Sequence, residues 1–597
     1  MFKLSFFGLL FMIVHFLSAQ SSRYTISFPN AVHHEAEITA SFSNLTDSVV
    51  ELRMSRTSPG RYALHEFAKN VYGVTVTDSK GNPLKITRPN PYQWNVSGHD
   101  GVVSIKYTLY GNRGDGTYSQ IDETHAHLNI PATFMYAPLL AENPIEVYFN
   151  LREDLDWKVA TQLKHIKGNL YFAPNLHYFM DSPVEISNYS LRQFTETSNG
   201  KNYTIRFVLH HKGTEAELDE YFENVKKIVQ EEKKVYGELP EFDYGEYTFL
   251  ACYIDNASGD GMEHRNSTIL TSTRSLSEGG MKNNIGTVSH EFFHAWNVER
   301  IRPKSLNPFN YKEANMSGEL WFAEGFTSYY TNLILCRAGI ITPKEYIKSL
   351  ESTFNYVWNS PARSYFNPIE MSYQAPFVDA ATSVDPVNRE NTFISYYSYG
   401  SVLGLALDLS LRNEAANLDL DGYMKLVWNT FGKTETPYTI ENLHNALNKY
   451  AGKAFGDHFF NTYIYKSKMP DYKKLFESVG VSLKIDDTKA YFGAVIKSKI
   501  ITKNPKKGTP VYNAGLEKGD LLISFGNTTI YPSTDLDELL ERYLPNDEVV
   551  IFYNRFGEQR QTKVTLGNNP TYIIKLFEDA GLPPSKEMLK NRKKWLK

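Results

Sequence analysis

The sequence predicts a multidomain protein with an N-terminal antiparallel β domain, a central α+β domain with a largely helical lower half, and a small C-terminal β module. Its 597 residues exceed the size of one domain, and 42% hydrophobic with 22% charged residues is an ordinary globular composition. The apolar pattern changes from strand-like to helical near residue 214 and becomes strand-like again near residue 490. The first predicted helix is Glu215–Tyr236, with apolar positions that include Leu218 and Val225. We therefore expect a β domain at 20–212, an α+β domain at 213–485, a β module at 486–570 and a helical tail at 571–597.

Short β-rich runs separated by turn residues fill the first part of the chain. The turn Lys80-Gly81-Asn82-Pro83, for example, precedes the strand candidate Val102–Tyr110 and follows Val71–Thr77. This spacing is typical of an antiparallel sandwich or an open barrel. The other runs are Arg23–Phe28, Glu35–Phe42 and Val49–Met54.

Residues 1–19 have the pattern of a secretory signal peptide. Lys3 provides a short positive region, Leu4–Leu17 is apolar, and Ser18-Ala19 offers a cleavage site with small residues. An uncleaved membrane anchor is the alternative. No later apolar run is long enough to span a bilayer, so we expect an exported mature chain, periplasmic or secreted, without a membrane span.

Charge and cysteine content exclude two other classes of protein. The net charge is −4, with both signs spread along the chain, which is not the pattern of a nucleic-acid-binding protein. Cys252 and Cys336 are the two cysteines, too few for a disulfide scaffold. We expect both in the core, although the sequence does not tell whether they pair.

The central motif is His290-Glu291-Phe292-Phe293-His294, within the helical pattern Ile285–Val298. Residues four apart differ by about 40° around a helix, so the two imidazoles share a face and can bind one zinc ion. Glu291 is rotated by about 100° from His290 and can accept a proton from the attacking water. The alternative is a pair of helical histidines without a metal, but buried histidines need partners and a metal supplies one.

A catalytic zinc ion needs a third protein ligand and an open position. The candidates are Glu319 and Glu324, at the start of a second apolar helix that continues through Leu333. Both fit on chemistry alone, and periodicity does not choose between them.

These residues together resemble the gluzincin metallopeptidases and, more narrowly, the glycyl aminopeptidase family with a C-terminal PDZ domain. The run HEFFHAWNVERIRP at 290–303 resembles the zinc helix of that family, and LWFAEGFTSYY at 320–330 resembles its third-ligand helix, which favours Glu324. The resemblance implies a thermolysin-like catalytic domain, one catalytic zinc ion, and removal of small first residues, Gly or Ala, from peptides with free N-termini.

Two further segments extend the resemblance. Residues 261–267, GMEHRNS, are similar to the Gly-x-Met-Glu-Asn segment of related aminopeptidases, which implies substrate binding by Gly261, Met262, Glu263 and His264. An edge backbone would pair with the peptide, and the Glu263 carboxylate would hold its amino terminus. Asp260 replaces the usual Gly.

Residues 395–401, SYYSYGS, resemble a Tyr-x-Lys-Gly segment, which implies that Tyr397 stabilises the oxyanion, with Tyr399 in place of Lys. The alternative is that these tyrosines are core or surface aromatics. Ser328 stands where thermolysin-like enzymes place an Asp that orients a zinc histidine, so the acceptor for the imidazoles is not identified.

In the PDZ-like module, the loop Tyr491, Phe492, Gly493 and Ala494 is the expected nest for a peptide or protein C-terminus. A structural or dimerisation module without a free ligand is the alternative. We also expect a strand at Gly493–Ile496, a helix opened by Ser533/Thr534 with Asp537 in the capping box, and a solvated surface helix at Ser585–Lys597.

Two other functions compete with the aminopeptidase. One is an exported metallo-endopeptidase whose substrates the PDZ module presents. The other is a non-catalytic PDZ-type peptide-binding protein, against which the complete set of His290, Glu291 and His294 argues.

Overall fold

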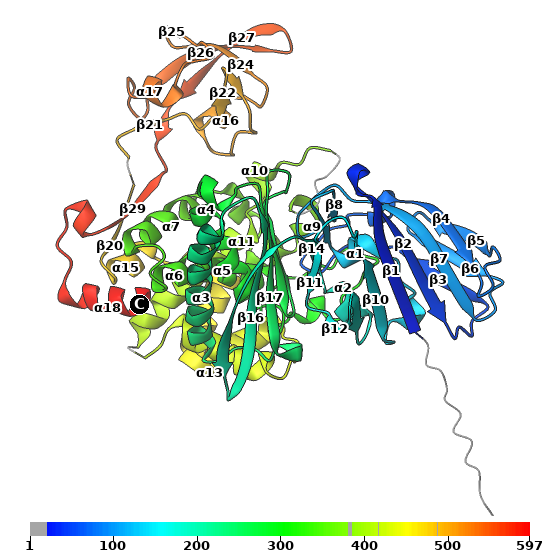
Figure 1. Cartoon of the computed structure of the whole chain (residues 1–597). Helices are drawn as coiled ribbons and strands as arrows, with labels where there is room; N and C mark the ends of the chain where they lie inside the picture. The colour runs from blue at the N-terminus through cyan, green and yellow to red at the C-terminus, as the bar shows by residue number, and fades with distance from the viewer. Residues whose placement is uncertain (1–20, 380–384, 416, 486) are drawn as a thin grey trace, which may run out of the picture.

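A computed structural model describes residues 21–379, 385–415, 417–485 and 487–597 of the chain; the predicted signal peptide therefore lies outside the described residues. The predicted fold class is confirmed. A β-rich N-terminal domain lies beside a central domain with a helical lower half, and a small β module follows (Figure 1). Within the described part of the chain, no helix combines the length and apolarity needed to cross a membrane.

The N-terminal domain is built around a seven-stranded sheet in the order β12-β13-β10-β1-β2-β7-β4. The sheet is not purely antiparallel as predicted, because β1 and β10 pair in parallel. A three-stranded sheet, β3-β6-β5, and a four-stranded sheet, β11-β14-β9-β8, complete the domain. The strands are β1 (Ser21–Asn30), β2 (Glu35–Ser43), β3 (Val49–Arg53), β4 (Val71–Thr77), β5 (Lys85–Asn90), β6 (Gln93–Ser97), β7 (Val102–Tyr110), β8 (Gln120–Ile121), β9 (His125–Leu128), β10 (Ile145–Asn150), β11 (Lys158–Thr161), β12 (Lys164–Lys167), β13 (Leu170–Ala173) and β14 (Val184–Ser187), with the short helices α1 (Ile130–Thr133) and α2 (Leu176–Met180).

The central domain begins with a five-stranded sheet in the order β15-β16-β17-β19-β18. This sheet extends across the domain boundary predicted at 212/213. Strand-like residues on both sides of this boundary pair with each other, since β16 hydrogen-bonds in parallel with β17. The strands are β15 (Ser190–Ser198), β16 (Lys201–His211), β17 (Glu246–Tyr253), β18 (Asp260–His264) and β19 (Ser267–Ser272).

Helix α3 (Glu215–Tyr236) covers one face of this sheet and matches the predicted helix. The Thr214 hydroxyl and the Glu217 carboxylate form a capping box at its start, and Gly237 ends it in the left-handed conformation. The predicted apolar positions, including Leu218 and Val225, are fully buried.

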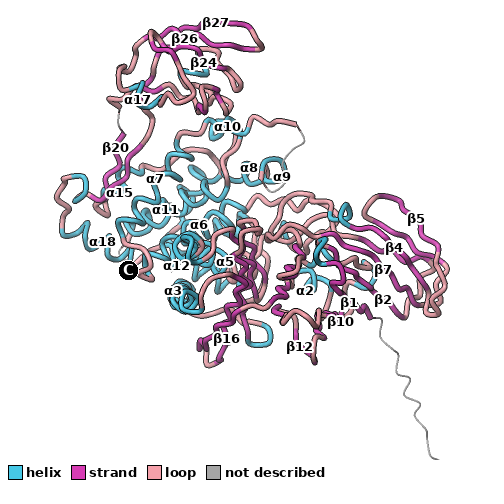
Figure 2. The backbone as a smooth tube through the Cα atoms, turned by 45° about the horizontal axis from the view of Figure 1, so that its top comes forward, coloured by secondary structure: helices cyan, strands magenta, loops and turns pink. Residues whose placement is uncertain are grey.

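The helical lower half centres on α5 (Ile285–Phe293), α6 (Leu320–Arg337) and α11 (Tyr396–Glu414), which lie together beside the sheet (Figure 2). Helix α5 is shorter than the predicted Ile285–Val298, since turns follow Phe293. The remaining helices are α4 (Met281–Asn283), α7 (Pro343–Trp358), α8 (Pro368–Ser372), α9 (Ala375–Val378), α10 (Arg389–Thr392), α12 (Leu420–Val427), α13 (Ile440–Ala451), α14 (Lys453–Phe459) and α15 (Tyr472–Glu477).

Glycine allows α6 and α11 to cross in direct backbone contact. A Cβ atom at Gly400 would lie 1.8 Å from the backbone oxygen of Trp321, and one at Gly325 would lie 2.3 Å from the Cα of Gly400. Any larger residue at either position would push the helices apart. This close crossing brings the start of α11 beside Glu324.

The C-terminal module has its own apolar core and a six-stranded sheet, β22-β23-β24-β26-β27 with β25 on β24. Two details of the prediction were wrong. The strand expected at Gly493–Ile496 is found at Ile496–Lys497 (β22). The helix expected to open at Ser533/Thr534 is instead capped by Asp535, whose carboxylate accepts hydrogen bonds from the backbone N–H groups of Asp537 and Glu538. The other elements are β21 (Ala490–Tyr491), β23 (Ile500–Ile501), α16 (Pro510–Asn513), β24 (Leu521–Phe525), β25 (Thr528–Thr529), α17 (Leu536–Leu540), β26 (Glu548–Arg555), β27 (Glu558–Thr565) and β28 (Gly567–Asn568).

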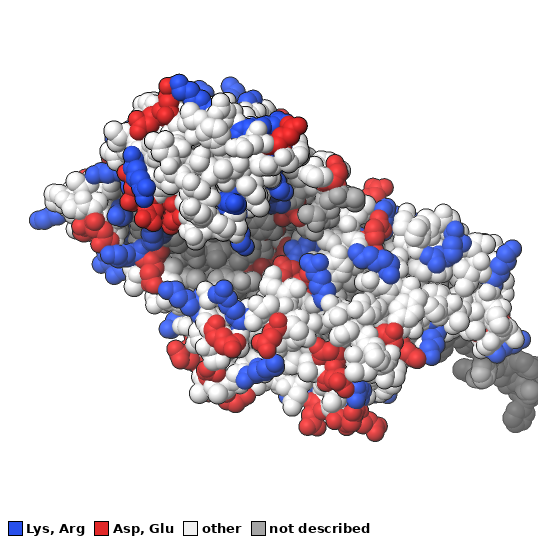
Figure 3. Space-filling view, turned by 90° about the horizontal axis from the view of Figure 1, so that it is seen from above, with Lys and Arg blue, Asp and Glu red and all other residues white. Residues whose placement is uncertain are grey.

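Both ends of the module connect to the central domain. The strand before it, β20 (Val481–Ile485), pairs with the strand after it, β29 (Tyr572–Leu576). Seen from above, a hollow separates the module from the rest of the molecule, and basic and acidic side chains are interspersed over this face (Figure 3).

The tail returns to the central domain as α18 (Lys586–Leu596). The prediction of a solvated surface helix was wrong for its last turn, because Trp595 is fully buried and donates its indole proton to the Tyr329 hydroxyl, 2.9 Å away. Charged residues dominate the tail sequence, so a single anchoring tryptophan left little signal in the periodicity.

Candidate metal centre

Helix α5 presents His290 in its last turn, and His294 follows as the C-cap residue with right-handed helical φ and ψ. One helical turn therefore separates the two imidazoles, and their Nε2 atoms lie 3.1 Å apart. His294 is buried and His290 is partly exposed toward a cavity.

Helix α6 adds the Glu324 carboxylate. Its Oε2 atom lies 3.2 Å from His294 Nε2 and 3.6 Å from His290 Nε2. Glu319, the other candidate, instead accepts hydrogen bonds from Ser305 (3.0 Å) and Ser317 (2.7 Å). The structure thus brings together His290, His294 and Glu324, and leaves Glu319 out of the cluster.

The outer nitrogen of each imidazole has a hydrogen-bond acceptor. His290 Nδ1 lies 3.1 Å from the Thr331 hydroxyl, whose own proton is donated to the Thr327 carbonyl, and His294 Nδ1 lies 2.5 Å from the Asn297 carbonyl. Both Nδ1 atoms can therefore carry the proton, which leaves the two Nε2 atoms near Glu324 Oε2 to bind a metal. Two lone pairs and a carboxylate oxygen in mutual contact are a donor set that fits zinc. Thr331 and Asn297 are the acceptors that the sequence did not identify.

The N-terminal domain contributes a residue that sequence reasoning missed. The Tyr62 hydroxyl donates a 2.6 Å hydrogen bond to Glu324 Oε1. Burial and the nearby Glu324 raise the pKa of Tyr62 well above its usual value, so the phenol remains a neutral donor. The bond occupies one carboxylate oxygen and leaves the other to the imidazoles.

Glu291 lies against β18. A Cβ atom at Gly261 would be 2.0 Å from Glu291 Oε1, so only glycine permits this contact. Ligand atoms of Glu291, Glu263 and His294 lie within 4.8 Å of one another. Burial and the proximity of Glu263 raise the pKa of Glu291, and burial together with Glu324 raises that of Glu263 to about 7.

Strand β18 divides the four predicted substrate-binding residues between two environments. Gly261 and Glu263 line the cavity, whereas Met262 and His264 do not. His264 instead contacts Asp181 of the N-terminal domain, 2.9 Å away, and Met262 is fully buried. Successive side chains of a strand point to opposite faces, so a contiguous motif could not place all four at the substrate.

Tyr397 at the start of α11 also lines this cavity of about 200 Å³, together with Arg61, Asp260 and the cluster residues. Its ring centroid lies 5.9 Å from that of His290. The ring of the neighbouring Tyr396 stacks on that of Tyr397, with centroids 4.9 Å apart, and its hydroxyl donates to Asp379. Arg61, which pairs with Asp260, is a second cavity residue from the N-terminal domain that sequence reasoning missed.

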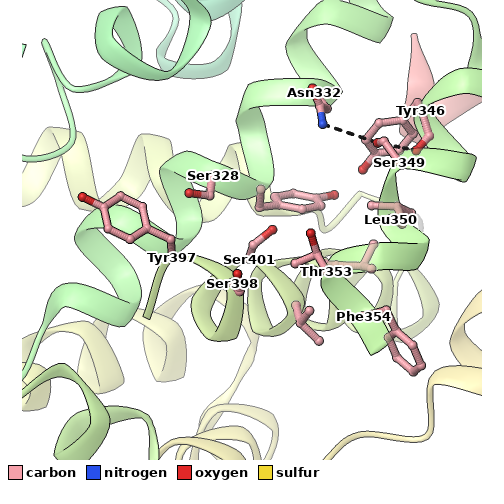
Figure 4. Close-up of a pocket in the computed structure, with 13 residues that line it drawn as sticks. Ser328, Asn332, Tyr346, Ser349, Leu350, Thr353, Phe354, Tyr397, Ser398 and Ser401 are labelled. Atoms are coloured by element: carbon pink, nitrogen blue, oxygen red, sulfur yellow. Dashed lines mark hydrogen bonds between the residues drawn. The ribbon is translucent and has the colours of Figure 1, made fainter. Parts of the chain in front are cut away.

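A separate cavity of about 220 Å³ lies between α6, α7 and α11. Tyr397 stands at one end of it, with the hydroxyl directed away from the other labelled side chains (Figure 4). The lining is a mixture of hydroxyls and apolar groups, such as Ser401 and Leu350, and contains no acidic, basic or cysteine side chain. This lining offers no metal-ligand cluster, so the cavity is not a second candidate for the metal centre.

In the C-terminal module, Phe492 is buried and Gly493 has φ +87°, while Ala494 leads toward β22. Tyr491 belongs to β21. The expected loop thus lies immediately before the edge strand of the six-stranded sheet.

Comparison with known proteins agrees with this architecture. Residues 23–188 match the Peptidase M61 N-terminal domain, residues 283–403 match M61 glycyl aminopeptidase, and residues 478–566 match the PDZ domain. The chain therefore carries the two domains of an M61 peptidase, followed by a PDZ domain. This M61 peptidase is a zinc-dependent aminopeptidase, and its cluster of two histidines and a glutamate is suited to the metal.

An aminopeptidase N family protein from Idiomarina loihiensis shares the fold of the M61 peptidase, with a TM-score of 0.84 and 24% identity over 96% of this chain and 100% of that chain. An M1 zinc metallopeptidase from Deinococcus radiodurans is less similar, with a TM-score of 0.44 and 11% identity over 76% of this chain and 94% of that chain. Legionella pneumophila aminopeptidase A has a TM-score of 0.42 and 12% identity, over 96% of this chain and 60% of that chain. Comparison with curated protein sequences gives no match.

Proposed function

We propose that this peptidase removes Gly or Ala from the N-termini of peptides, with one catalytic zinc ion held by His290, His294 and Glu324. The observation that carries the proposal is the buried Glu263 carboxylate, which lies within 4.8 Å of Glu291 and His294. A second carboxylate so close to the general base is suited to a substrate ammonium group, and an internal peptide bond offers no such group.

In this mechanism the chain's own residues bind and move protons around a zinc ion, which supplies Lewis-acid chemistry when bound. Glu291 accepts a proton from the attacking water and transfers it to the leaving amine. Its raised pKa favours the protonated intermediate of this transfer. Tyr397 donates a hydrogen bond to the developing oxyanion, because its phenol remains neutral: burial and Glu324 raise its pKa well above the usual value.

Glu263 binds the free amino terminus, which aligns the first peptide bond with Glu291. Since the pKa of Glu263 is raised to about 7, the positive substrate also favours its ionised form. The edge strand β18 offers its backbone to the extended peptide, and Gly261 on this strand allows Glu291 to lie beside it.

The preference for small first residues is supported by the family and by the limited cavity of about 200 Å³. We expect kcat/KM for anilide substrates to fall in the order Gly and Ala, then Leu, then Phe. Equal rates for Gly and Phe anilides would contradict the preference and leave the aminopeptidase assignment intact.

The decisive experiment compares a peptide with a free N-terminus and the same peptide N-acetylated. We expect cleavage only of the free peptide, released one residue at a time, and Glu263→Gln should lower kcat/KM for it while zinc content stays unchanged. Cleavage of the acetylated peptide at a comparable rate would instead favour the endopeptidase. Met262→Leu is a suitable control, because this neighbour on β18 does not line the cavity.

We further propose that the PDZ domain binds a peptide or protein C-terminus through Tyr491, Phe492, Gly493 and Ala494, and that residues 1–19 export the enzyme to the periplasm or the medium. The edge strand β22 supports the first point, since an added peptide can pair with it. A free C-terminal peptide should bind more tightly than its amide, and equal binding would exclude a carboxylate nest. Finding the chain in the cytoplasm with an intact N-terminus would contradict export.

A further inference from the structure

A second cluster of metal-ligand residues lies at the junction of the N-terminal and central domains. His125, His210 and Cys252 each offer a ligand atom, and these atoms lie within 4.8 Å of one another. Cys252 Sγ lies 3.6 Å from His210 Nδ1, and the two imidazole rings are 4.9 Å apart. None of these residues lies in the cavity of the catalytic cluster.

Strand register brings the donors to one place. His210 on β16 and Cys252 on β17 are direct partners in the parallel pair, so their side chains share a face of the central sheet. Val208 and Leu250, two residues earlier on each strand, share that face. Both form an apolar cluster with Ala160, which lies on β11 of the opposing sheet of the N-terminal domain, and with Tyr189, which follows β14 of that sheet.

The N-terminal domain supplies the facing donors from its four-stranded sheet. His125 lies on β9 and Glu185 on the neighbouring β14, whose Ser187 is the register partner of His125. Glu185 Oε1 lies 3.7 Å from His210 Nδ1. The four side chains thus come from two adjacent strands in each of two sheets that belong to different domains.

Two buried atoms in the cluster have no hydrogen-bond partner, His125 Nε2 and Glu185 Oε1. Both residues are at least 99% buried, and leaving such polar atoms unpaired is costly. The other ring nitrogen of His125 lies 3.0 Å from the Thr124 hydroxyl and 3.5 Å from Asp122 Oδ1. A carboxylate behind the outer nitrogen, with a free inner nitrogen, is the usual environment of a metal-binding histidine.

We propose that His125, His210 and Cys252 bind a second, structural zinc ion, with Glu185 as the fourth donor. Nitrogen and thiolate ligands in a closed, buried site are the preference of structural zinc. The thiolate and the carboxylate balance the charge of the ion.

The position of this ion suggests its role. It would join the sheet that carries β9 and β14 to the sheet that carries β16 and β17, and so fix the two domains relative to each other. The N-terminal domain also supplies Tyr62, which bonds to Glu324, and Arg61, which lines the catalytic cavity. The second zinc ion therefore stabilises the domain arrangement on which those two contacts depend.

The test uses the fact that the chain has two cysteines, one in the cluster and one on α6, both unpaired. Cobalt bound to a thiolate gives a charge-transfer absorption that a site of two histidines and a glutamate lacks. We expect this band in the cobalt-substituted parent and in the matched control Cys336→Ser, and its loss in Cys252→Ser. His294→Ala, which damages only the catalytic cluster, should retain the band.

Zinc content gives the second readout. The parent should hold two zinc ions per chain, and Cys252→Ser and His294→Ala should each hold one. A parent protein that takes up cobalt without the thiolate band overturns the proposal, as does Cys252→Ser with two zinc ions. If the catalytic cluster binds no zinc, the thiolate band would still be present, and only the proposed function would fail. If the second cluster binds no metal, the band would be absent, and only the proposal of a second zinc ion would fail.

Discussion

The bond from Tyr62 to Glu324 makes a quantitative prediction about the metal centre. Tyr62→Phe removes one oxygen atom and keeps the ring that packs in the core. The lost bond is short, 2.6 Å, joins a phenol to a carboxylate, and is buried on both sides. Hydrogen bonds to charged groups contribute about 1.5–3 kcal/mol, and about 1.4 kcal/mol corresponds to a tenfold change in affinity.

We therefore expect Tyr62→Phe to weaken zinc binding by about 10- to 100-fold, in line with other residues that orient metal ligands. The assay is competition for zinc with a chelator of known affinity, followed by kcat/KM at saturating zinc. The matched control is Tyr24→Phe, which removes a buried hydroxyl of the same domain that bonds to the Met135 carbonyl. If Tyr62→Phe binds zinc as tightly as the control, the hydroxyl does not position Glu324 and the reasoning fails.

Three further predictions concern the general base, the tail and a buried acid. Glu291→Gln should retain its zinc and lose about 10²–10⁴-fold in kcat, as expected for a general base; turnover of Gly or Ala anilides near the parent rate would show that another group takes the proton. Trp595→Ala should lower the free energy of unfolding by about 3–5 kcal/mol in denaturant titrations, whereas the exposed Leu589→Ala on the same helix should change it little; equal effects would mean that the tail does not anchor on α6. Burial raises the pKa of Glu232, so its carboxyl keeps its proton in the folded protein. In the unfolded chain the same group ionises above its usual pKa of about 4.3, and the folded protein therefore loses stability as the pH rises above that value. Glu232→Gln should thus gain stability over the parent, by up to about 1.4 kcal/mol per pH unit, in thermal unfolding between pH 5 and 8; a constant difference across this range would contradict a protonated Glu232.

Local patterns predicted the elements well where one period dominates. Helix α3 and strands β4 and β7 have the predicted bounds, and in α3 and β7 one regular face is buried. The β15–β16 hairpin precedes the boundary predicted at 212/213, yet it belongs to the sheet that continues into the central domain. Its alternation predicts a strand, but the choice of β17 as its neighbour depends on residues about 40 positions away.

The sequence by itself determined the paired imidazoles, because the helical repeat fixes His290 and His294 one turn apart whatever surrounds them. It also narrowed the third ligand to two glutamates on the next helix. Only the tertiary structure decided between them. The close crossing of α6 and α11 and the hydrogen bond from Tyr62 position Glu324, and both are contacts between residues far apart in the sequence. The same holds for the acceptors Thr331 and Asn297 and for the cluster of His125, His210 and Cys252. Tertiary packing brings these atoms together, and the local periodicity of the sequence does not predict which residues will meet.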